Sequence, residues 1–375
     1  MTPTPTQAEA IRAILAWYDG GDSTPREFYL AGYAGTGKTT IYRVVRDELR
    51  ARGVHVLSAA FTGKAALVLR RKGIDDAQTL HSLLYSVSTD AEGRPVFTLD
   101  SFGPMYDANL LAVDEVSMVG EGLANDARSF GKKILVLGDP GQLPPVKGAG
   151  AFTNREPDYF LSEIHRQAAE SPIIRLATLA REGQPIPVGD YGDNVRVLPL
   201  NGDTWRSILD PDTQVICGTH KTRFSATQRI REHRGFGGRY PLAGERVLCM
   251  RNDRKTGIFN GGLGTMLADA KVWPGDGNMD IDVAMDDLQM PLRRLPVHRF
   301  HFDQHFGTYE RPRIHRGYAE FDWGNVLTCH KAQGSEFPHV TAIDDSGAFG
   351  PERNKWNYTT LTRASDGVTY LKRAA

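Results

Sequence analysis

Short apolar runs alternate along the chain with segments of helical periodicity. The runs EFYLA (27–31), LLAVD (110–114) and KKILVLG (132–138) have the length and the β-favouring residues of buried strands. The segment KTTIYRVVRDELRARG (38–53) has the period of an amphipathic helix and ends at Gly53. Strands and helices in alternation predict an α/β protein with parallel strands.

Two segments break this alternation. In SVSTDAEGRPVFTLDSF (86–102), a polar turn around Glu92 and Gly93 precedes a short β-favouring run, which predicts a β-hairpin. The stretch 263–320 contains the alternating run MDIDVAM and then a segment rich in His, Arg and aromatic residues, 297–317. Basic residues interleaved with Phe and Tyr suit a channel for single-stranded nucleic acid. The irregular spacing of the histidines, with no Cys nearby, argues against zinc.

Composition narrows the class of protein only slightly. Lys and Arg number 45 against 45 Asp and Glu, so the net charge is zero and any basic surface must be local. The three cysteines (Cys217, Cys249 and Cys329) form no C-x-x-C pair, which argues against a zinc site and a disulfide scaffold. The N-terminus is polar and no apolar run is long enough to span a bilayer, so we expect a soluble cytoplasmic protein without a membrane partner.

The loop AGYAGTGKTT (31–40) lies between the first predicted strand and the helix after it. It matches G-x-x-x-x-G-K-[ST] from Gly32 through Lys38 to Thr39. Such glycines let backbone N–H groups turn toward phosphates at the positive end of a helix. Lys38 would reach the β- and γ-phosphates of ATP, and the Thr39 hydroxyl would ligate Mg²⁺. The alternative is a glycine-rich turn that binds nothing.

Two further strand ends carry residues suited to ATP hydrolysis. Asp114, at the tip of the second run, suits a carboxylate that organises Mg²⁺, and Glu115 suits the general base that polarises the attacking water. Gln142, in the Gly/Pro-rich loop after the third run, is placed to sense the γ-phosphate. Each motif alone is also compatible with an ordinary strand-to-loop transition, but their order favours an ATPase.

Seven ordered motifs resemble superfamily 1 helicases of the RecD and phage Dda type: GYAGTGKTT, AAFTGKAA, TLHSLL, VDEVSMV, GDPGQLPPV, LTCHKAQGSEF and YTTLTRA. The resemblance extends from Gln7 to Arg363. It implies an α/β fold of two RecA-like P-loop lobes with parallel sheets, a small β-hairpin insertion in the first and a small SH3-like β insertion in the second. It also implies an ATP-dependent 5′-to-3′ DNA helicase that uses ATP and Mg²⁺.

The motif order, together with the resemblance, sets the expected domain limits. The first lobe would comprise 1–85 and 107–160, with the hairpin at 86–106. The second lobe would comprise 161–262 and 321–375, with the SH3-like insertion at 263–320.

The resemblance also assigns residues to the nucleotide. Arg166 and Arg363 match arginines that touch the γ-phosphate from across the cleft between the lobes, and would join Lys38, Glu115 and Gln142 in catalysis. Gln7 resembles a glutamine that reads adenine, and Glu336 a ligand of the ribose hydroxyls. The nucleotide-binding set is then Gln7, Gly35, Thr36, Gly37, Lys38, Thr39, Thr40, Gly334 and Glu336, and the Mg²⁺ ligands are Thr39 and Asp114.

A second set is expected on the DNA. Aromatic residues would stack bases, and Thr, Lys and His residues would bind phosphates or bases. The set is Phe61, Thr62, Lys64, Thr79, His81, Phe97, His220, Lys221, Thr328 and His330. Phe97, in the hairpin, would stack on the junction base pair, or else fold onto the lobe; Phe61 has core packing as its alternative.

The stretch 220–240 is locally very basic and is expected to form a phosphate-binding face. It also departs from the family pattern, because relatives often carry asparagine where this chain has Phe224. The usual polar contact there is in doubt, and stacking is the expected substitute.

The expected partners are single-stranded and forked duplex DNA, bound by a monomer in a bacterium or a phage-infected cell, together with replication or recombination proteins. Two rival functions stay open. One is a single-stranded DNA translocase or remodeller without strong unwinding. The other is a nucleotide switch that binds a protein partner.

Overall fold

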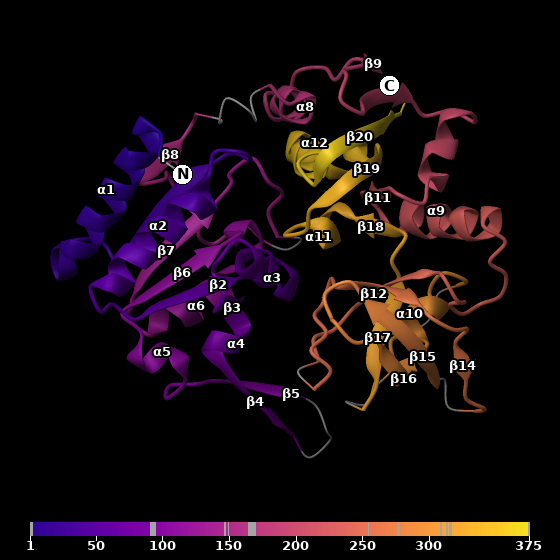
Figure 1. The fold of residues 1–375 in the computed structure, drawn as a ribbon, viewed down its shortest axis with the longest axis horizontal. Coiled ribbons are helices and arrows are strands. Elements are labelled where there is room, and N and C mark those ends of the chain that lie inside the picture. Colours follow the sequence, from indigo (N-terminus) through magenta and orange to yellow (C-terminus); the bar gives the residue numbers. More distant parts are fainter. Residues whose placement is uncertain are drawn as a thin grey trace. The chain divides into compact units, whose positions relative to one another are not determined.

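A computed structural model describes residues 3–90, 95–145, 148, 150–163, 170–253, 255–275, 278–307, 310–312, 314 and 317–373. The chain forms two compact units (Figure 1). Unit 1 comprises residues 1–88 and 95–184, and residues 185–375 make up the body of unit 2. Within the described residues, every helix is too short or too polar to cross a membrane.

Unit 1 is built on a six-stranded parallel sheet with the strand order β3-β2-β6-β7-β1-β8. The strands are β1 (Glu27–Gly32), β2 (Val56–Ala60), β3 (Gln78–Thr79), β6 (Leu110–Asp114), β7 (Lys133–Gly138) and β8 (Tyr159–Leu161). The helices are α1 (Pro5–Asp19), α2 (Lys38–Ala51), α3 (Gly63–Arg71), α4 (Leu80–Leu84), α5 (Pro104–Asp107), α6 (Glu121–Ser129) and α8 (Pro172–Arg181). The three apolar runs of the sequence are β1, β6 and β7, which confirms the α/β class.

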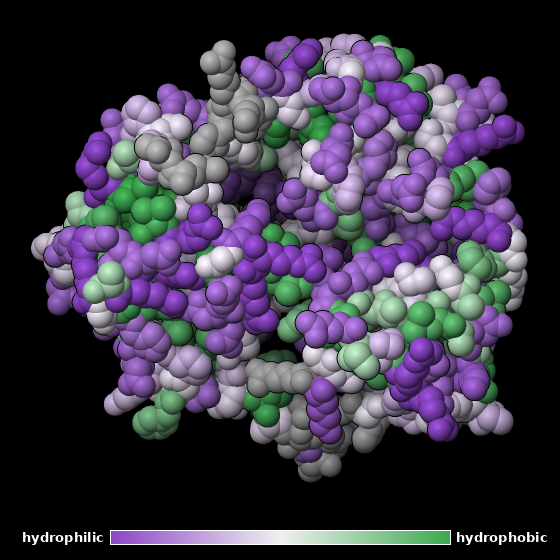
Figure 2. All heavy atoms as spheres, in the orientation of Figure 1, coloured by the Kyte–Doolittle hydropathy of each residue, from purple (hydrophilic) through white to green (hydrophobic). Residues whose placement is uncertain are grey.

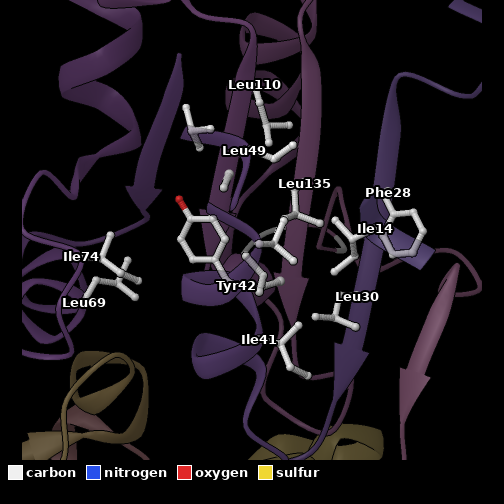
Figure 3. Close-up of a cluster of buried hydrophobic side chains, with 14 of the residues drawn as sticks. Ile14, Phe28, Leu30, Ile41, Tyr42, Leu49, Leu69, Ile74, Leu110 and Leu135 are labelled. Atoms are coloured by element: carbon white, nitrogen blue, oxygen red, sulfur yellow. The ribbon is translucent and has the colours of Figure 1, made fainter. Parts of the chain in front are cut away.

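Both faces of this sheet are buried, because successive strand residues point to opposite sides. Phe28 and Leu30 of β1 pack with α1 and α2 in one apolar cluster, whereas Tyr29 and Ala31 belong to a second cluster with α4 to α6. Figure 3 shows the first cluster: Ile14 of α1 and Ile41 of α2 lie against the strand residues Leu30 and Leu135. Side chains buried on both faces explain why the strands read as continuous apolar runs.

The hairpin expected after TLHSLL is present as a separate two-stranded sheet of β4 (Tyr85–Thr89) and β5 (Pro95–Leu99). In Figure 1 it extends away from the helices of unit 1. The turn expected at Glu92 and Gly93 lies outside the described residues.

Unit 1 continues past residue 160, where the sequence placed the lobe boundary. Strand β8 pairs in parallel with β1, and α8 belongs to the same compact unit, which ends at Gln184. Strand β8 is an edge strand of three residues. A run this short has no hydrophobic periodicity from which it could be predicted.

Unit 2 contains a second sheet, with the order β18-β11-β19-β20-β10-β9, parallel except for β9. Its strands are β9 (Gly189–Asp190), β10 (Val195–Pro199), β11 (Gln214–Cys217), β18 (Val326–Thr328), β19 (Phe337–Ile343) and β20 (Ala364–Lys372). Its helices are α9 (His220–His233), α11 (Cys329–Ala332) and α12 (Arg353–Leu361), with 3₁₀ segments η3 (Thr204–Leu209) and η4 (Ser346–Glu352).

A β barrel lies within unit 2. Its strands are β12 (Arg246–Cys249), β13 (Leu263–Met266), β15 (Asn278–Met285), β16 (Leu292–His298) and β17 (Ala319–Trp323), with the edge strand β14 (Lys271–Val272) and the short helix α10 (Phe300–Asp303). Pairing of β13 with both β12 and β15 closes the sheet on itself. Alternate residues of β15, from Met279 to Met285, fill its core. The barrel therefore begins at Arg246 and ends at Trp323, which is wider than the expected limits 263–320.

The face of the molecule shown in Figure 2 is mainly hydrophilic, with apolar side chains in small separate groups. The most exposed large apolar side chains include Phe97 on β5 and Phe102, which follows the hairpin. Both lie in unit 1.

Candidate nucleotide and nucleic-acid sites

The phosphate loop joins β1 to α2, as its sequence predicts. Gly35 and Gly37 have φ angles of 80° and 85°, a left-handed conformation that residues with a Cβ rarely adopt. This backbone leads directly into the first turn of α2, where Lys38, Thr39 and Thr40 present amides without intrahelical acceptors. The loop therefore has the backbone form of a phosphate cradle.

The side chain of Lys38 is held against the phosphate loop by two backbone carbonyls of that loop. Its Nζ donates to the carbonyl oxygen of Gly32 at 2.6 Å and to that of Tyr33 at 3.0 Å. An ammonium bound only to neutral carbonyls remains free to exchange them for phosphate oxygens, which carry negative charge.

Gln7 contacts the same loop from the start of α1. Thr4 and Gln7 form a capping box, and Gln7 Nε2 also donates to the carbonyl oxygen of the buried Thr36 at 3.2 Å. Gln7 therefore fixes the position of α1 against the loop. The T-x-x-Q spacing is a sequence signal for the cap, but it does not reveal the contact with Thr36.

Thr39 and Asp114 meet at the carboxyl ends of the unit 1 strands. Thr39 Oγ1 donates to Asp114 Oδ2 at 3.1 Å, and the Glu115 amide donates to Asp114 Oδ1 at 2.8 Å. Burial and the neighbouring Glu115 carboxylate raise the pKa of Asp114, while Lys38 opposes the shift. A hydroxyl and a buried carboxylate, whose hydrogen bonds among the described residues come from neutral donors, form a suitable oxygen donor pair for Mg²⁺.

Glu115 and Gln142 are connected through Ser117. Glu115 has φ of 54°, an uncommon value for a residue with a side chain and one that occurs at functional sites. Two residues later, Ser117 Oγ donates to Oε1 of the buried Gln142 at 3.2 Å. A shift at Gln142 can therefore reach the segment that positions Glu115.

The nucleotide-site candidates of unit 2 lie around the end of α12. Arg363 is buried, and its guanidinium donates to the carbonyl oxygens of Thr359 and Ser335 at 3.1 and 3.2 Å. Gly334 has φ of 73°, and Glu336 is exposed. Arg166 lies outside the described residues.

In unit 1, two neighbouring strands end in threonines that cap helices. Ala60 of β2 lies opposite Thr79 of β3 in the parallel pairing. Thr62 caps α3 by accepting from the Ala65 amide at 3.1 Å, and Thr79 caps α4 by accepting from the Ser82 amide at 3.2 Å. Parallel strands end at the same edge, so both threonines lie at one edge of the sheet, with Lys64 half-buried in α3.

Four aromatic rings extend from this edge into the hairpin. Ring centroids are 6.2 Å apart for Phe61 and His81, 5.9 Å for His81 and Tyr85, and 6.1 Å for Tyr85 and Phe97. Partial desolvation lowers the pKa of His81, which favours the neutral ring. The sequence interpretation included three of these rings and missed Tyr85, although Tyr85 lies four residues after His81.

The same arrangement occurs in unit 2. Cys217 of β11 lies opposite Thr328 of β18. Thr219 caps α9 by accepting from the Thr222 amide at 3.1 Å, and Thr328 caps α11 by accepting from the Lys331 amide at 3.4 Å. The side chains of His220 and Lys221 are exposed, and that of His330 is half-buried. Thr219 is a further candidate that the sequence interpretation did not include.

The predicted basic face of 220–240 is wrong for two of its central arginines. Arg223 pairs with the buried Asp322 at 2.6 Å, and Arg231 pairs with the buried Glu245 at 2.7 Å. These residues lie on the inner face of α9, against the barrel, so their charges are neutralised inside unit 2. Lys221, by contrast, is exposed next to the Thr219 cap, as is His220.

The prediction of a nucleic-acid channel from 297–317 is also wrong for its first half. Phe300 and Phe302 are buried, His301 Nε2 lies 2.9 Å from Glu320, and His305 Nε2 lies 2.8 Å from Asp322. These rings fill the space beside β17. Phe306 remains partly exposed.

Residues 2–199 match the family model described as "AAA domain", and residues 324–369 match the "UvrD-like helicase C-terminal domain". The chain is 30% identical over 364 residues to the "ATP-dependent RecD2 DNA helicase" of Deinococcus radiodurans, an alignment that covers 90% of this chain and 46% of that protein. The chain spans less than half the length of the first curated relatives that it matches.

Two solved structures share the fold. One, from a study of DNA unwinding at forked double-stranded DNA by two coordinating Pif1 helicases, has a TM-score of 0.60 at 19% identity and covers 100% of this chain and 93% of its own. The other, Pif1 from Bacteroides in complex with ADP-AlF3 and single-stranded DNA, has a TM-score of 0.58 at 19% identity and covers 100% and 94%. The two parallel sheets are therefore those of two RecA-like lobes.

Proposed function

Since this chain belongs to the AAA-domain family and, within it, to the superfamily 1 helicases, we propose that it is an ATP-dependent DNA helicase. In this proposal it moves 5′ to 3′ along single-stranded DNA and separates duplex DNA ahead of it. It acts as a monomer in the cytoplasm of a bacterium or phage-infected cell. Replication or recombination proteins are its proposed protein partners.

This proposal rests on an arrangement of strand ends that occurs in both units. Each unit presents two adjacent parallel strands that lead into helix-capping threonines, and a histidine follows one or two residues after Thr79, Thr219 and Thr328. Threonine hydroxyls and helix-terminal amides suit the phosphate backbone, and flat rings suit bases of any sequence. A simple nucleotide switch has no need for two such edges, one in each ATPase-type lobe.

In unit 1, each residue at the phosphate loop would have its own role in ATP hydrolysis. Lys38 exchanges the carbonyls of Gly32 and Tyr33 for the β- and γ-phosphates of ATP. Glu115 accepts a proton from the attacking water, and Gln142 transmits the state of the γ-phosphate through Ser117. Thr39 and Asp114 would hold Mg²⁺, which supplies charge neutralisation at the phosphates when it is bound.

The remaining nucleotide-site candidates would complete the cycle. Arg166 and Arg363 would supply positive charge to the γ-phosphate, Glu336 would contact the ribose beside Gly334, and Gln7 would contact adenine. Binding and release of the γ-phosphate would then alternate the two threonine-capped edges between strong and weak hold on the strand. That alternation is a step along DNA.

Tailed duplexes test this function. We expect unwinding of a duplex with a 5′ single-stranded tail, weaker or no unwinding with a 3′ tail, and ATP hydrolysis stimulated by single-stranded DNA. Unwinding that starts only from the 3′ tail would overturn the direction. ATP hydrolysis without any response to DNA would favour the nucleotide switch instead.

Phe97 is proposed to separate the strands. Its side chain is 56% exposed, although it packs edge-on against Tyr85, so its free face is available to a base pair. Phe97→Ala should lower the unwinding rate about tenfold, the value of one lost base–aromatic stack, while DNA-stimulated hydrolysis stays near the wild-type rate.

Val96→Ala, on the same strand, is the matched control, because it removes an exposed apolar side chain without removing a ring. Equal loss of unwinding and hydrolysis in Phe97→Ala would contradict the assignment. Unchanged unwinding would favour a translocase whose hairpin does not act on the duplex.

A further inference from the structure

A third strand ends beside the capped edge of unit 2. The sheet order places β11 between β18 and β19, and all three run parallel. The chain leaves β19 through Asp344 and Asp345 and enters the 3₁₀ segment η4 (Ser346–Glu352), which contains Phe349. Phe349 is therefore carried by the loop next to Thr219 and Thr328, yet it belongs to none of the seven motifs.

Hydrogen bonds fix this loop to the capped strand end. Asp345 Oδ2 accepts from the amides of Gly218 and Thr219 at 3.0 and 3.1 Å, and its Oδ1 pairs with Arg373 at 2.7 Å. Asp344 Oδ1 accepts from the amide of Ser346 at 3.0 Å. The loop and the start of α9 are thus held as one rigid piece.

The ring of Phe349 lies directly over the turn after β11. A Cβ added to Gly218 would lie 2.7 Å from Phe349 Cε2, so only glycine lets the backbone pass this close to the ring. The ring centroid is 5.9 Å from that of His330, at 30° between planes, and 5.8 Å from that of Trp356, at 32°.

These three rings run from the core to the surface. Trp356 is fully buried, whereas Phe349 and His330 are half-buried. Phe349 therefore has one side supported by a rigid tryptophan and leaves ring surface uncovered beside His330. A supported ring with uncovered surface, near two threonines that are proposed to bind phosphates, is suited to stacking against a nucleic-acid base.

We propose that Phe349 is a base-stacking residue of unit 2 and that, with His330, it holds one base of the bound single strand. The inference rests on the proposed function and adds a contact to its strand site. Asp345 is a positioning residue in this arrangement, because it acts through the backbone of Gly218 and Thr219. The competing role for Phe349 is a cover over Trp356 alone.

A scan with abasic sites separates these roles. The probe is a fluorescein-labelled oligothymidine of about 12 nucleotides, with one abasic site moved along it, and binding to the full chain is measured by anisotropy without nucleotide. In the wild type, abasic substitution at the base held by Phe349 should weaken binding about tenfold. In Phe349→Leu that single position should lose its sensitivity, whereas the other sensitive positions keep theirs.

Two variants serve as controls. Phe349→Tyr keeps the ring and should retain the wild-type profile. Phe102→Leu removes a ring that is 88% exposed in unit 1 and belongs to no proposed site, and it should also retain it. The melting temperature of Phe349→Leu should match the wild type, because leucine still covers Trp356.

The outcomes are distinct. If wild-type protein binds the oligonucleotide and Phe349→Leu keeps every sensitive position, the stacking role is wrong and the proposed function stands. If Phe349→Leu only lowers the melting temperature, Phe349 is a cover for the core and the proposal fails. If the wild type does not bind the oligonucleotide, both the stacking role and the helicase proposal are overturned.

Discussion

Replacing Lys38 with alanine is expected to abolish ATP hydrolysis, with a loss in kcat of about 10³-fold or more. Phosphoryl transfer spreads negative charge over the γ-phosphate oxygens, and the Lys38 ammonium is the cation at the start of α2. That ammonium donates to the carbonyl oxygens of Gly32 and Tyr33, so these neutral hydrogen bonds are the ones exchanged for phosphate oxygens when ATP binds.

The measurement is phosphate release at saturating single-stranded DNA, alongside binding of a fluorescent ATP analogue. Lys72→Ala is the matched control, since Lys72 is an exposed lysine in the same unit with no assigned role. A melting curve shows whether Lys38→Ala disturbs the loop, where the carbonyls of Gly32 and Tyr33 lose a donor. Wild-type turnover in Lys38→Ala would refute the phosphate-loop assignment.

The parts of the site that depend on local sequence could be predicted. The glycines of the phosphate loop, the carboxylates Asp114 and Glu115, and the threonines Thr62, Thr79 and Thr328 each lie at the end of a strand or within a few residues after it. Strand ends of a parallel sheet gather at one edge, so spacing along the chain translates into proximity in space. For these residues the structure adds distances to an arrangement that was already expected.

The contacts that depend on residues far away in the sequence could not be predicted. Arg223 looks like a surface cation in the basic stretch 220–240, but its partner Asp322 is 99 residues away and belongs to β17. Arg231 is neutralised by Glu245 in the same way. A charge on the inner face of a helix is recognisable only when the element it packs against is known.

Contacts between aromatic rings likewise could not be predicted from the sequence. His330 belongs to a family motif and Trp356 lies two residues before another, but Phe349, between them, lies in the η4 segment, whose sequence SGAFGPE is typical of a simple turn. Its position is set by Asp345 and by the close approach to Gly218. Neither contact has a counterpart in the spacing of the sequence.

Arg363→Ala is expected to spare ATP binding and to lower hydrolysis by about 10³- to 10⁵-fold, the contribution of a transition-state arginine in other phosphoryl-transfer enzymes. The structure adds a complication to this test. Arg363 donates to the carbonyl oxygens of Ser335 and Thr359, so its removal takes a donor away from each of these carbonyls and costs about 1–3 kcal/mol of stability. A drop in activity from Arg363→Ala alone is therefore ambiguous.

Arg363→Gln resolves the ambiguity, because its amide can still donate to one of these carbonyls but carries no charge. If the charge acts on the γ-phosphate, Arg363→Gln loses nearly as much kcat as Arg363→Ala, while its melting temperature lies closer to the wild type and its affinity for ATP is unchanged. If activity instead follows the melting temperature across the two variants, Arg363 only supports the turn after Gly334. An arginine that serves both purposes must release the two carbonyls in each cycle, and that exchange would couple ATP to the segment that carries Thr328 and His330.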